Sequence, residues 1–161
     1  MRTIRTATMQ DLDVIARIEE ACFPAAEAAS RQSFAERLKF YPNHFWLLEE
    51  DGEIISFVNG MATDEPDLKD EMYENAAMHD ESGAWQMIFG VNTLPKHRKK
   101  GCAGELLERA IEDAKNQRRS GLVLTCKDPL IHYYAKFGFL DEGLSRSTHG
   151  GVVWHQMRLC F

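Results

Sequence analysis

The sequence predicts an α/β (α+β) domain with a mixed central sheet of about seven strands flanked by about four helices. Stretches with apolar residues at helical spacing alternate along the chain with short runs rich in aromatic and β-branched residues. Some of these runs are separated by turn dipeptides and others by helical stretches, so the sheet should contain both antiparallel hairpins and parallel crossovers. With 161 residues, we expect a single domain over residues 1–161.

The chain is expected to begin with a short strand and two helices. A strand over residues 3–7 precedes an amphipathic helix over residues 9–22, whose start carries a capping-box pattern of Thr8 and Asp11. Ser30 is a suitable N-cap for the second helix, because its hydroxyl can accept a hydrogen bond from a free amide of the first turn.

A hairpin and an acidic segment are expected next. Strands over residues 45–50 and 53–61 flank Asp51-Gly52, a dipeptide that favours a two-residue hairpin turn. Residues 64–84, which we call the acidic segment, then interrupt the alternation with eight acids and one lysine. A long excursion of this kind in a small domain is more often functional than not.

Strands and helices alternate in the C-terminal part of the chain. The predicted elements are a strand over residues 85–91, a helix over 103–117, a strand over 122–126, a helix over 130–137 and strands over 139–145 and 152–159. Gly150-Gly151 is expected to turn the chain between the last two strands.

The composition excludes several classes of protein. Hydrophobic residues make up 44% of the chain and charged residues 27%, which argues against long disorder. No run approaches the roughly 18 apolar residues of a membrane span. The four cysteines form no CxxC pair and have no histidine at zinc-finger spacing. We therefore expect a cytoplasmic protein with reduced thiols, no metal and no membrane partner, either a monomer or a homodimer.

Charge is divided unevenly along the chain. Residues 1–90 hold 7 basic and 18 acidic residues, a net charge of −11, whereas residues 91–161 hold 12 and 7, a net charge of +5. This division fits a protein that binds an anion with its C-terminal half and a cation with the other half. The alternative is that surface charge drifts along the chain without a function.

The most informative stretch, residues 91–107, is a strand followed by a basic turn and the start of a helix. Free amides at a helix N-terminus favour an anion, and Gly101 and Gly104 would let a phosphate approach the backbone closely. The stretch therefore predicts a polyphosphate site that is neither GxGxxG nor a P-loop. A nucleic-acid surface is not expected, because these few cations belong to an acidic protein and have no aromatic residues between them.

Two motifs resemble those of the GNAT acyltransferases. Residues 98–103, Arg-Lys-Lys-Gly-Cys-Ala, resemble that family's pyrophosphate signature Q/R-x-x-G-x-G/A, and residues 133–139, Tyr-Tyr-Ala-Lys-Phe-Gly-Phe, resemble its second signature. The resemblance covers essentially the whole chain and implies the GNAT fold with acetyl-CoA as the acyl donor. The implied CoA-binding residues are Phe89, Gly90, Val91, Arg98, Lys99, Lys100, Gly101, Cys102, Ala103, Gly104 and Tyr134. Of these, Cys102 could be a thiol nucleophile, but we interpret it as a packing residue.

Within that superfamily the chain resembles the arylalkylamine (serotonin) N-acetyltransferase branch. The similar segments are Cys22-Phe23-Pro24 with Glu27, then Cys126-Lys127-Asp128-Pro129-Leu130, then residues 134–139. Vertebrate members of the branch have two histidines where this chain has Trp85 and Met87, so a proton relay here must be built from other groups.

Tyr134 and Glu27 are the candidate catalytic residues. The resemblance places Tyr134 near the CoA sulfur, where a phenol could protonate the leaving thiolate; the alternative is a core aromatic residue. Glu27 could bind the substrate ammonium or take its proton; the alternative is a solvated loop acid or a helix cap. His79, His149 and His155 are further candidates for the base.

The expected reaction is acetyl transfer from acetyl-CoA to a primary amine of a small molecule, such as an arylalkylamine or a polyamine. The acidic segment could attract the cationic amine, with Met72, Tyr73 and Trp85 as an apolar wall, or it could be a solvated surface. Two other functions stay open, a non-catalytic acyl-CoA-binding regulatory module and a peptide or protein N-acetyltransferase. The absence of the two strand histidines at Trp85 and Met87 favours the non-catalytic module, whereas the presence of Tyr134 argues against it.

Overall fold

The computed structural model describes residues 1–161 as nine strands and five α-helices joined by turns and short 3-10 segments. The strands are β1 (Arg2–Thr6), β2 (Phe45–Glu50), β3 (Glu53–Asn59), β4 (Ala62–Thr63), β5 (Trp85–Ile88), β6 (Gly90–Thr93), β7 (Gly121–Cys126), β8 (Leu140–Leu144) and β9 (His155–Cys160). The helices are α1 (Leu12–Cys22), α2 (Arg31–Phe40), α3 (Glu71–Glu74), α4 (Cys102–Asn116) and α5 (Ile131–Ala135).

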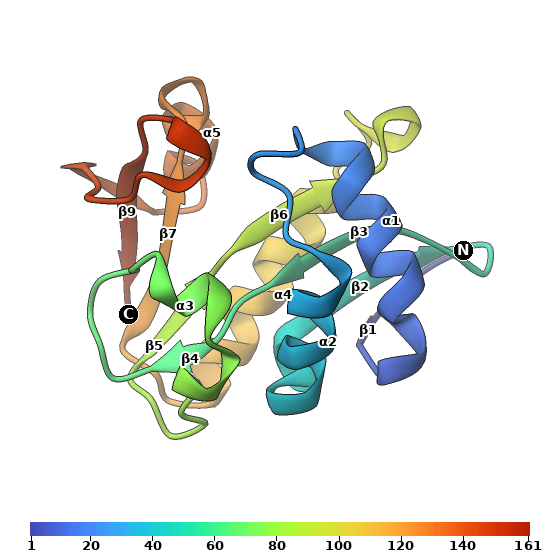
Figure 1. Ribbon diagram of the computed structural model, residues 1–161, viewed down its shortest axis with the longest axis horizontal. Helices are drawn as coiled ribbons and strands as arrows, with labels where there is room; N and C mark the ends of the chain where they lie inside the picture. The colour runs from blue at the N-terminus through green and yellow to red at the C-terminus, as the bar shows by residue number, and fades with distance from the viewer.

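The predicted fold class is confirmed, but the strands form two sheets rather than one. The first sheet has the order β1-β2-β3-β6 with antiparallel pairs, and the second has the order β4-β5-β7-β9-β8. In the second sheet β5 and β7 are parallel, which is the crossover expected around α4. The two sheets come apart where β5 ends and β6 begins (Figure 1).

The strand predicted over residues 85–91 is therefore wrong as one continuous element. Met87 and Ile88 pair with β7, whereas Gly90 and Val91 pair with β3, and Phe89 lies between the two sheets. The Phe89 amide still donates to the Asn59 carbonyl oxygen at 2.7 Å. Because the strand changes partner at this point, backbone groups of residues 88–91 are available on the open side of the split.

Short-range signals at the first two helices are confirmed. The Thr8 amide donates to Asp11 Oδ2 at 2.8 Å, as in a capping box, but residues 9–11 form a 3-10 turn and α1 begins at Leu12. At α2, Ser30 Oγ accepts from the Ser33 amide at 3.1 Å.

The hairpin is also confirmed. Asp51 and Gly52 both have positive φ, 52° and 83°, as a primed two-residue turn between twisted strands requires. The tight turn predicted at Gly150-Gly151, in contrast, belongs to a longer connection between β8 and β9, residues 145–154. Gly150 is needed for close approach, because a Cβ there would lie 2.6 Å from the Glu27 Cγ.

Two apolar cores lie on opposite sides of the first sheet. One packs α1 and α2 against the sheet and includes Phe34, Phe45 and Phe57; the other packs α4 beneath it and includes Leu106 and Leu107. Figure 1 shows α1 and α2 on the near side and α4 on the far side. No helix combines the length and the apolar character needed to cross a membrane.

Candidate active site

A cavity of about 810 Å³ lies at the split between the two sheets. Its floor includes Ile88, Phe89, Gly90 and Val91, the residues at which the strand changes partner. The loop between α1 and α2, the acidic segment and residues 124–130 and 148–154 contribute the walls. The fold therefore places groups from both halves of the chain around one cavity.

A second, smaller cavity of about 410 Å³ lies at the N-terminus of α4. It is lined by Arg98, Lys99 and Gly101 to Gly104, which the sequence predicts as a phosphate-binding turn. Lys100 is not among its lining residues, and its carbonyl oxygen accepts from Arg2 instead. Five residues line both cavities: Cys22, Phe23, Val91, Leu130 and Tyr134.

The backbone at the α4 N-terminus is arranged for an anion. Lys99 and Gly101 have positive φ of 65° and 79°, and no side chain caps the first turn of α4. A Cβ on Gly101 would meet nothing within 4 Å, so the space beside this backbone is open. Cys102 is buried and its thiol faces the His97 carbonyl oxygen at 3.8 Å, as expected of a packing residue.

Tyr134 lies on α5 at the junction of the two cavities. Its side chain is 7% exposed, and burial raises the pKa of its phenol well above the usual value. The phenol therefore stays protonated at neutral pH and can serve as a proton donor to a group in either cavity.

Glu27 is neither a solvated loop acid nor a helix cap. Its carboxylate oxygens lie 2.8 Å and 3.0 Å from Lys127 Nζ, and the side chain is buried. The lysine in turn lies over the Trp154 ring, with Nζ 5.8 Å from its centroid. Because the Glu27 carboxylate already forms an ion pair with Lys127, the geometry gives no support to Glu27 as a free base.

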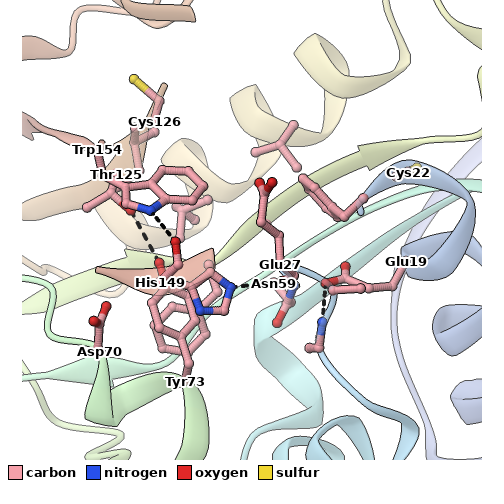
Figure 2. A pocket seen from close by; sticks show the side chains of 18 of the residues that line it. Glu19, Cys22, Glu27, Asn59, Asp70, Tyr73, Thr125, Cys126, His149 and Trp154 are labelled. Carbon is pink, nitrogen blue, oxygen red and sulfur yellow. Dashed lines mark hydrogen bonds between the residues drawn. The ribbon is translucent and has the colours of Figure 1, made fainter. Parts of the chain in front are cut away.

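His149 is the histidine that reaches the cavity, and its tautomer can be deduced. Its Nε2 lies 2.8 Å from the Glu27 carbonyl oxygen, which can only accept, so Nε2 carries the hydrogen (Figure 2). In the neutral ring the lone pair is then on Nδ1. The ring stacks on Tyr73 at 5.1 Å and 18°. His79 and His155 do not line the cavity.

The acidic segment contributes to the cavity, but its apolar wall differs from the prediction. Asp70, Tyr73 and two acids of α3, Glu71 and Glu74, line the cavity. Asp70 accepts from the Ser147 hydroxyl and from the Thr148 amide, the latter at 3.0 Å, which ties the segment to the β8–β9 connection.

The expected wall residues Met72 and Trp85 do not line the cavity. Met72 is fully buried in the apolar core, and the Trp85 ring packs under the Arg158 guanidinium at 4.7 Å. Of the predicted wall, only Tyr73 faces the cavity.

Two buried charged residues that the sequence did not single out also line the cavity. Glu19 lies on the α1 side of the cavity (Figure 2). It accepts from the Ala29 amide and from Asn92 Nδ2, each at 2.9 Å, and burial raises the pKa of its carboxyl. Arg37 donates to Asn59 Oδ1 and to the Tyr73 carbonyl oxygen, each at 3.0 Å. Nothing in the spacing of α2 could have distinguished Arg37 from a surface arginine.

A cluster outside the cavity, His44, His79 and Glu81, has three potential metal ligands within 4.8 Å. Its hydrogen bonds fit a polar network better than a metal site. His79 Nδ1 accepts from the Ala62 amide at 3.0 Å, so its Nε2 carries the hydrogen and donates to Glu81. Arg119 holds the other Glu81 oxygen at 2.9 Å.

Comparison with known proteins identifies the fold. A family model described as the Acetyltransferase (GNAT) family matches residues 12–139. The loading GNATL domain of CurA from Lyngbya majuscula aligns with a TM-score of 0.87 at 16% identity, over 99% of this chain and 98% of that one. The GphF GNAT-like decarboxylase in complex with isobutyryl-CoA aligns at 0.83 and 22% identity, over 98% of both chains. At such identities these likenesses establish the fold alone.

An N-acetyltransferase and a longer bacterial protein are also similar. The ribosomal-protein-S18-alanine N-acetyltransferase from Escherichia coli aligns with a TM-score of 0.76 at 20% identity, over 99% of this chain and 94% of that one. The protein named "Probable hydrolase YhcX" of Bacillus subtilis (strain 168) is 25% identical over 163 residues, 96% of this chain. The chain spans 30% of the length of that relative.

Proposed function

Because the chain belongs to the GNAT acetyltransferase family, we propose that it transfers the acetyl group of acetyl-CoA to a primary amine of a small molecule. The observation that carries the proposal is that the cavity at the α4 N-terminus and the large cavity share the lining residues Val91 and Tyr134. An acyl-CoA whose phosphates lie at the turn before α4 would therefore place its thioester carbon between Phe89 and Tyr134.

The α4 N-terminus is the proposed site for the pyrophosphate of CoA. Free amides from Lys99 to Gly104 and the side chains of Arg98 and Lys99 would hold it. The pantetheine arm would lie along Gly90 and Val91, because β6 pairs only with β3 and its other edge is free. An amide of that edge would stabilise the oxyanion of the tetrahedral intermediate.

The proposed chemistry uses one base and one acid. His149 Nδ1 takes a proton from the substrate ammonium, and the neutral amine attacks the thioester carbonyl carbon. The C–S bond of the resulting tetrahedral intermediate then breaks, and the Tyr134 phenol gives its proton to the CoA thiolate. Both residues return to their starting protonation state by exchange with solvent.

Contacts across the cavity favour a small acceptor over a peptide. The Glu27–Lys127 ion pair and the His149–Glu27 hydrogen bond join the α1–α2 loop to the second sheet over the cavity. A cavity of about 810 Å³ is within the range of small-molecule sites. Glu71 and Glu74 have no ion-pair partner and would attract a cationic amine such as an arylalkylamine or a polyamine.

Release of the CoA thiol with a panel of amines, amino acids and peptide N-termini tests the proposal. His149→Gln keeps a donor for the Glu27 carbonyl oxygen but removes the imidazole base, so kcat/KM should fall about 100-fold. The acid limb of the kcat/KM–pH profile should disappear in this variant. His155→Gln, at a histidine outside the cavity, is the matched control.

Three results would contradict parts of this proposal. CoA binding without turnover of any acceptor would identify a non-catalytic acyl-CoA-binding module. Turnover confined to peptide N-termini would identify a peptide N-acetyltransferase. An unchanged pH profile in the His149 variant would show that another group is the base.

A second candidate is decarboxylation of a carboxylated acyl-CoA, which the donors of the cavity favour. Arg37, Lys127 and His149 all line it, and Glu27, the carboxylate predicted to act in catalysis, is already paired with Lys127. Loss of CO2 breaks the bond between the α-carbon and the carboxylate, and the enolate left behind takes a proton from water at the α-carbon. Conversion of malonyl-CoA into acetyl-CoA and CO2 without an amine would favour this reaction over acetyl transfer.

A further inference from the structure

Arg37 is a buried cation without an ion-pair partner. Its side chain lines the large cavity and is only 3% exposed, yet no carboxylate oxygen lies within 4.0 Å of its guanidinium. Its two bonds go to neutral acceptors, Asn59 Oδ1 and the Tyr73 carbonyl oxygen, and its Nε–H has no acceptor. Burying such a charge without an anion is costly, which points to a partner supplied from outside the chain.

Neither buried acid of the cavity, Glu19 or Glu27, is arranged as an ion-pair partner for Arg37. Both Glu19 oxygens are already hydrogen-bonded, to the Ala29 amide and to Asn92 Nδ2. Burial raises the pKa of Glu19, which favours its neutral form. Glu27, the other buried acid of the cavity, is paired with Lys127.

The position of Arg37 connects it with the reacting centre. Its guanidinium carbon lies 5.1 Å from the Phe34 ring centroid and 5.1 Å from that of Phe89. The guanidinium therefore lies over two aromatic rings, and its N–H groups, which all point outward in the guanidinium plane, donate to a ligand along the edge of that plane. Phe89 is the residue at the split between the sheets, where the proposed thioester lies.

We propose that Arg37 binds a carboxylate of the reacting substrate, through the planar pairing that guanidinium and carboxylate groups form. This inference rests on the proposed function and refines its substrate class. The carboxylate has two potential sources: an amine acceptor of the amino-acid type, or the acyl group of a donor such as malonyl-CoA. In either case it lies within reach of the thioester, next to Phe89.

A carboxylate bound at Arg37 changes the substrate class that the acidic segment alone suggests. Acids at Glu71 and Glu74 favour a cationic amine and would disfavour a carboxylated one. Arg37 lies in the same cavity and provides the opposite charge. A zwitterion with neighbouring ammonium and carboxylate groups satisfies both kinds of residue, whereas a simple arylalkylamine leaves Arg37 unpaired.

A structural role for Arg37 is the competing explanation. The two hydrogen bonds of its guanidinium tie α2 to Asn59 at the end of β3 and to Tyr73 in α3. Loss of that tie would disturb every substrate equally, whereas loss of a carboxylate partner would affect only carboxylated ones. The ratio between two matched substrates therefore separates the explanations.

Phenylalanine and 2-phenylethylamine, which differ only in the carboxylate, are the matched acceptors. With wild-type protein and acetyl-CoA, we expect kcat/KM to be at least tenfold higher for phenylalanine. Arg37→Gln should reduce this ratio at least tenfold. Arg31→Gln, on the exposed start of the same helix, should leave it unchanged. Equal losses for both acceptors in the Arg37 variant would support the structural explanation and overturn the proposal for acceptors.

The other potential source of the carboxylate is the acyl group of the donor. Isothermal titration of the protein with malonyl-CoA and with acetyl-CoA, without any acceptor, tests it by comparing the two dissociation constants. If the acyl group supplies the carboxylate, wild-type protein should bind malonyl-CoA at least tenfold more tightly, and Arg37→Gln should remove the preference. Arg37-dependent binding without turnover of any amine would refute acetyl transfer but keep the carboxylate site. If the protein acetylates amines but prefers neither phenylalanine over 2-phenylethylamine nor malonyl-CoA over acetyl-CoA, acetyl transfer would be supported and the carboxylate site at Arg37 would be refuted. If Arg37→Gln does not fold, the wild-type preferences and Arg37→Lys decide the same question, because lysine keeps the charge but loses the planar pairing.

Discussion

Replacing Gly101 by alanine tests the anion-binding turn directly. Gly101 has a φ of 79°, a conformation that costs an alanine roughly 1–2 kcal/mol. The lower entropy of the unfolded alanine chain returns about 0.4–1 kcal/mol. We therefore expect Gly101→Ala to lower the free energy of unfolding by about 1 kcal/mol. No heavy atom lies within 4 Å of the new Cβ, so a steric clash adds nothing in the free protein.

The effect on CoA binding should be larger, because the open space beside Gly101 is where the proposed phosphate approaches the backbone. We expect the Kd for CoA to rise at least tenfold, or about 1.4 kcal/mol. Gly52 offers a matched control: its φ is 83°, a Cβ there also meets nothing within 4 Å, and it lies in the β2–β3 turn, outside both cavities. Gly52→Ala should show the same loss of stability and an unchanged Kd.

Urea denaturation and isothermal titration with CoA measure the two quantities for each variant. Either of two results would contradict a phosphate site at Gly101: folded Gly101→Ala binds CoA as the wild type does, or Gly52→Ala weakens CoA binding equally. The first result would place the phosphates elsewhere, and the second would mean that a general loss of stability explains the weaker binding.

Three further predictions concern catalysis and stability. Tyr134→Phe should lower kcat about 100-fold without changing the Kd for CoA, since it removes only the proposed donor; a wild-type rate at all pH values would make Tyr134 a packing residue. Because burial raises the pKa of Tyr134, its deprotonation should not limit the wild-type kcat below pH 10. The hydrogen bond from Arg5 lowers the pKa of Asp11 in the folded state, so the stability it provides is present above pH 4 and declines as the pH falls through the folded pKa. Asp11→Asn should lower stability at pH 7 by about 1 kcal/mol and flatten this decline in urea titrations between pH 7 and pH 3.

Features that depend on neighbouring residues could be predicted from the sequence. The Asp51-Gly52 hairpin, the Ser30 N-cap and the glycine turn before α4 are confirmed at the predicted positions. Each depends on the backbone freedom or the hydrogen-bonding capacity of residues a few positions apart. The fold class follows from the same source, because the periods of apolar residues report which faces of each element are buried.

The division of one predicted strand between two sheets depended on more distant partners. Residues 85–91 have the composition of a single strand. The change of partner at Phe89 arises because β7 pairs with its first half and β3 with its second. Pairing across a sheet depends on the register of strands far apart in the chain, and local composition carries little information about it.

The charged groups of the cavity were decided by tertiary structure alone. Glu27 meets Lys127 across 100 positions of the chain, and His149 meets the Glu27 carbonyl oxygen across 122. The acids of the first half predict a site for cations, but no local pattern in the sequence marks Arg37 as buried and without an ion-pair partner. The energy of a charge depends on its burial and on its partners within a few ångströms, and only the folded chain determines both.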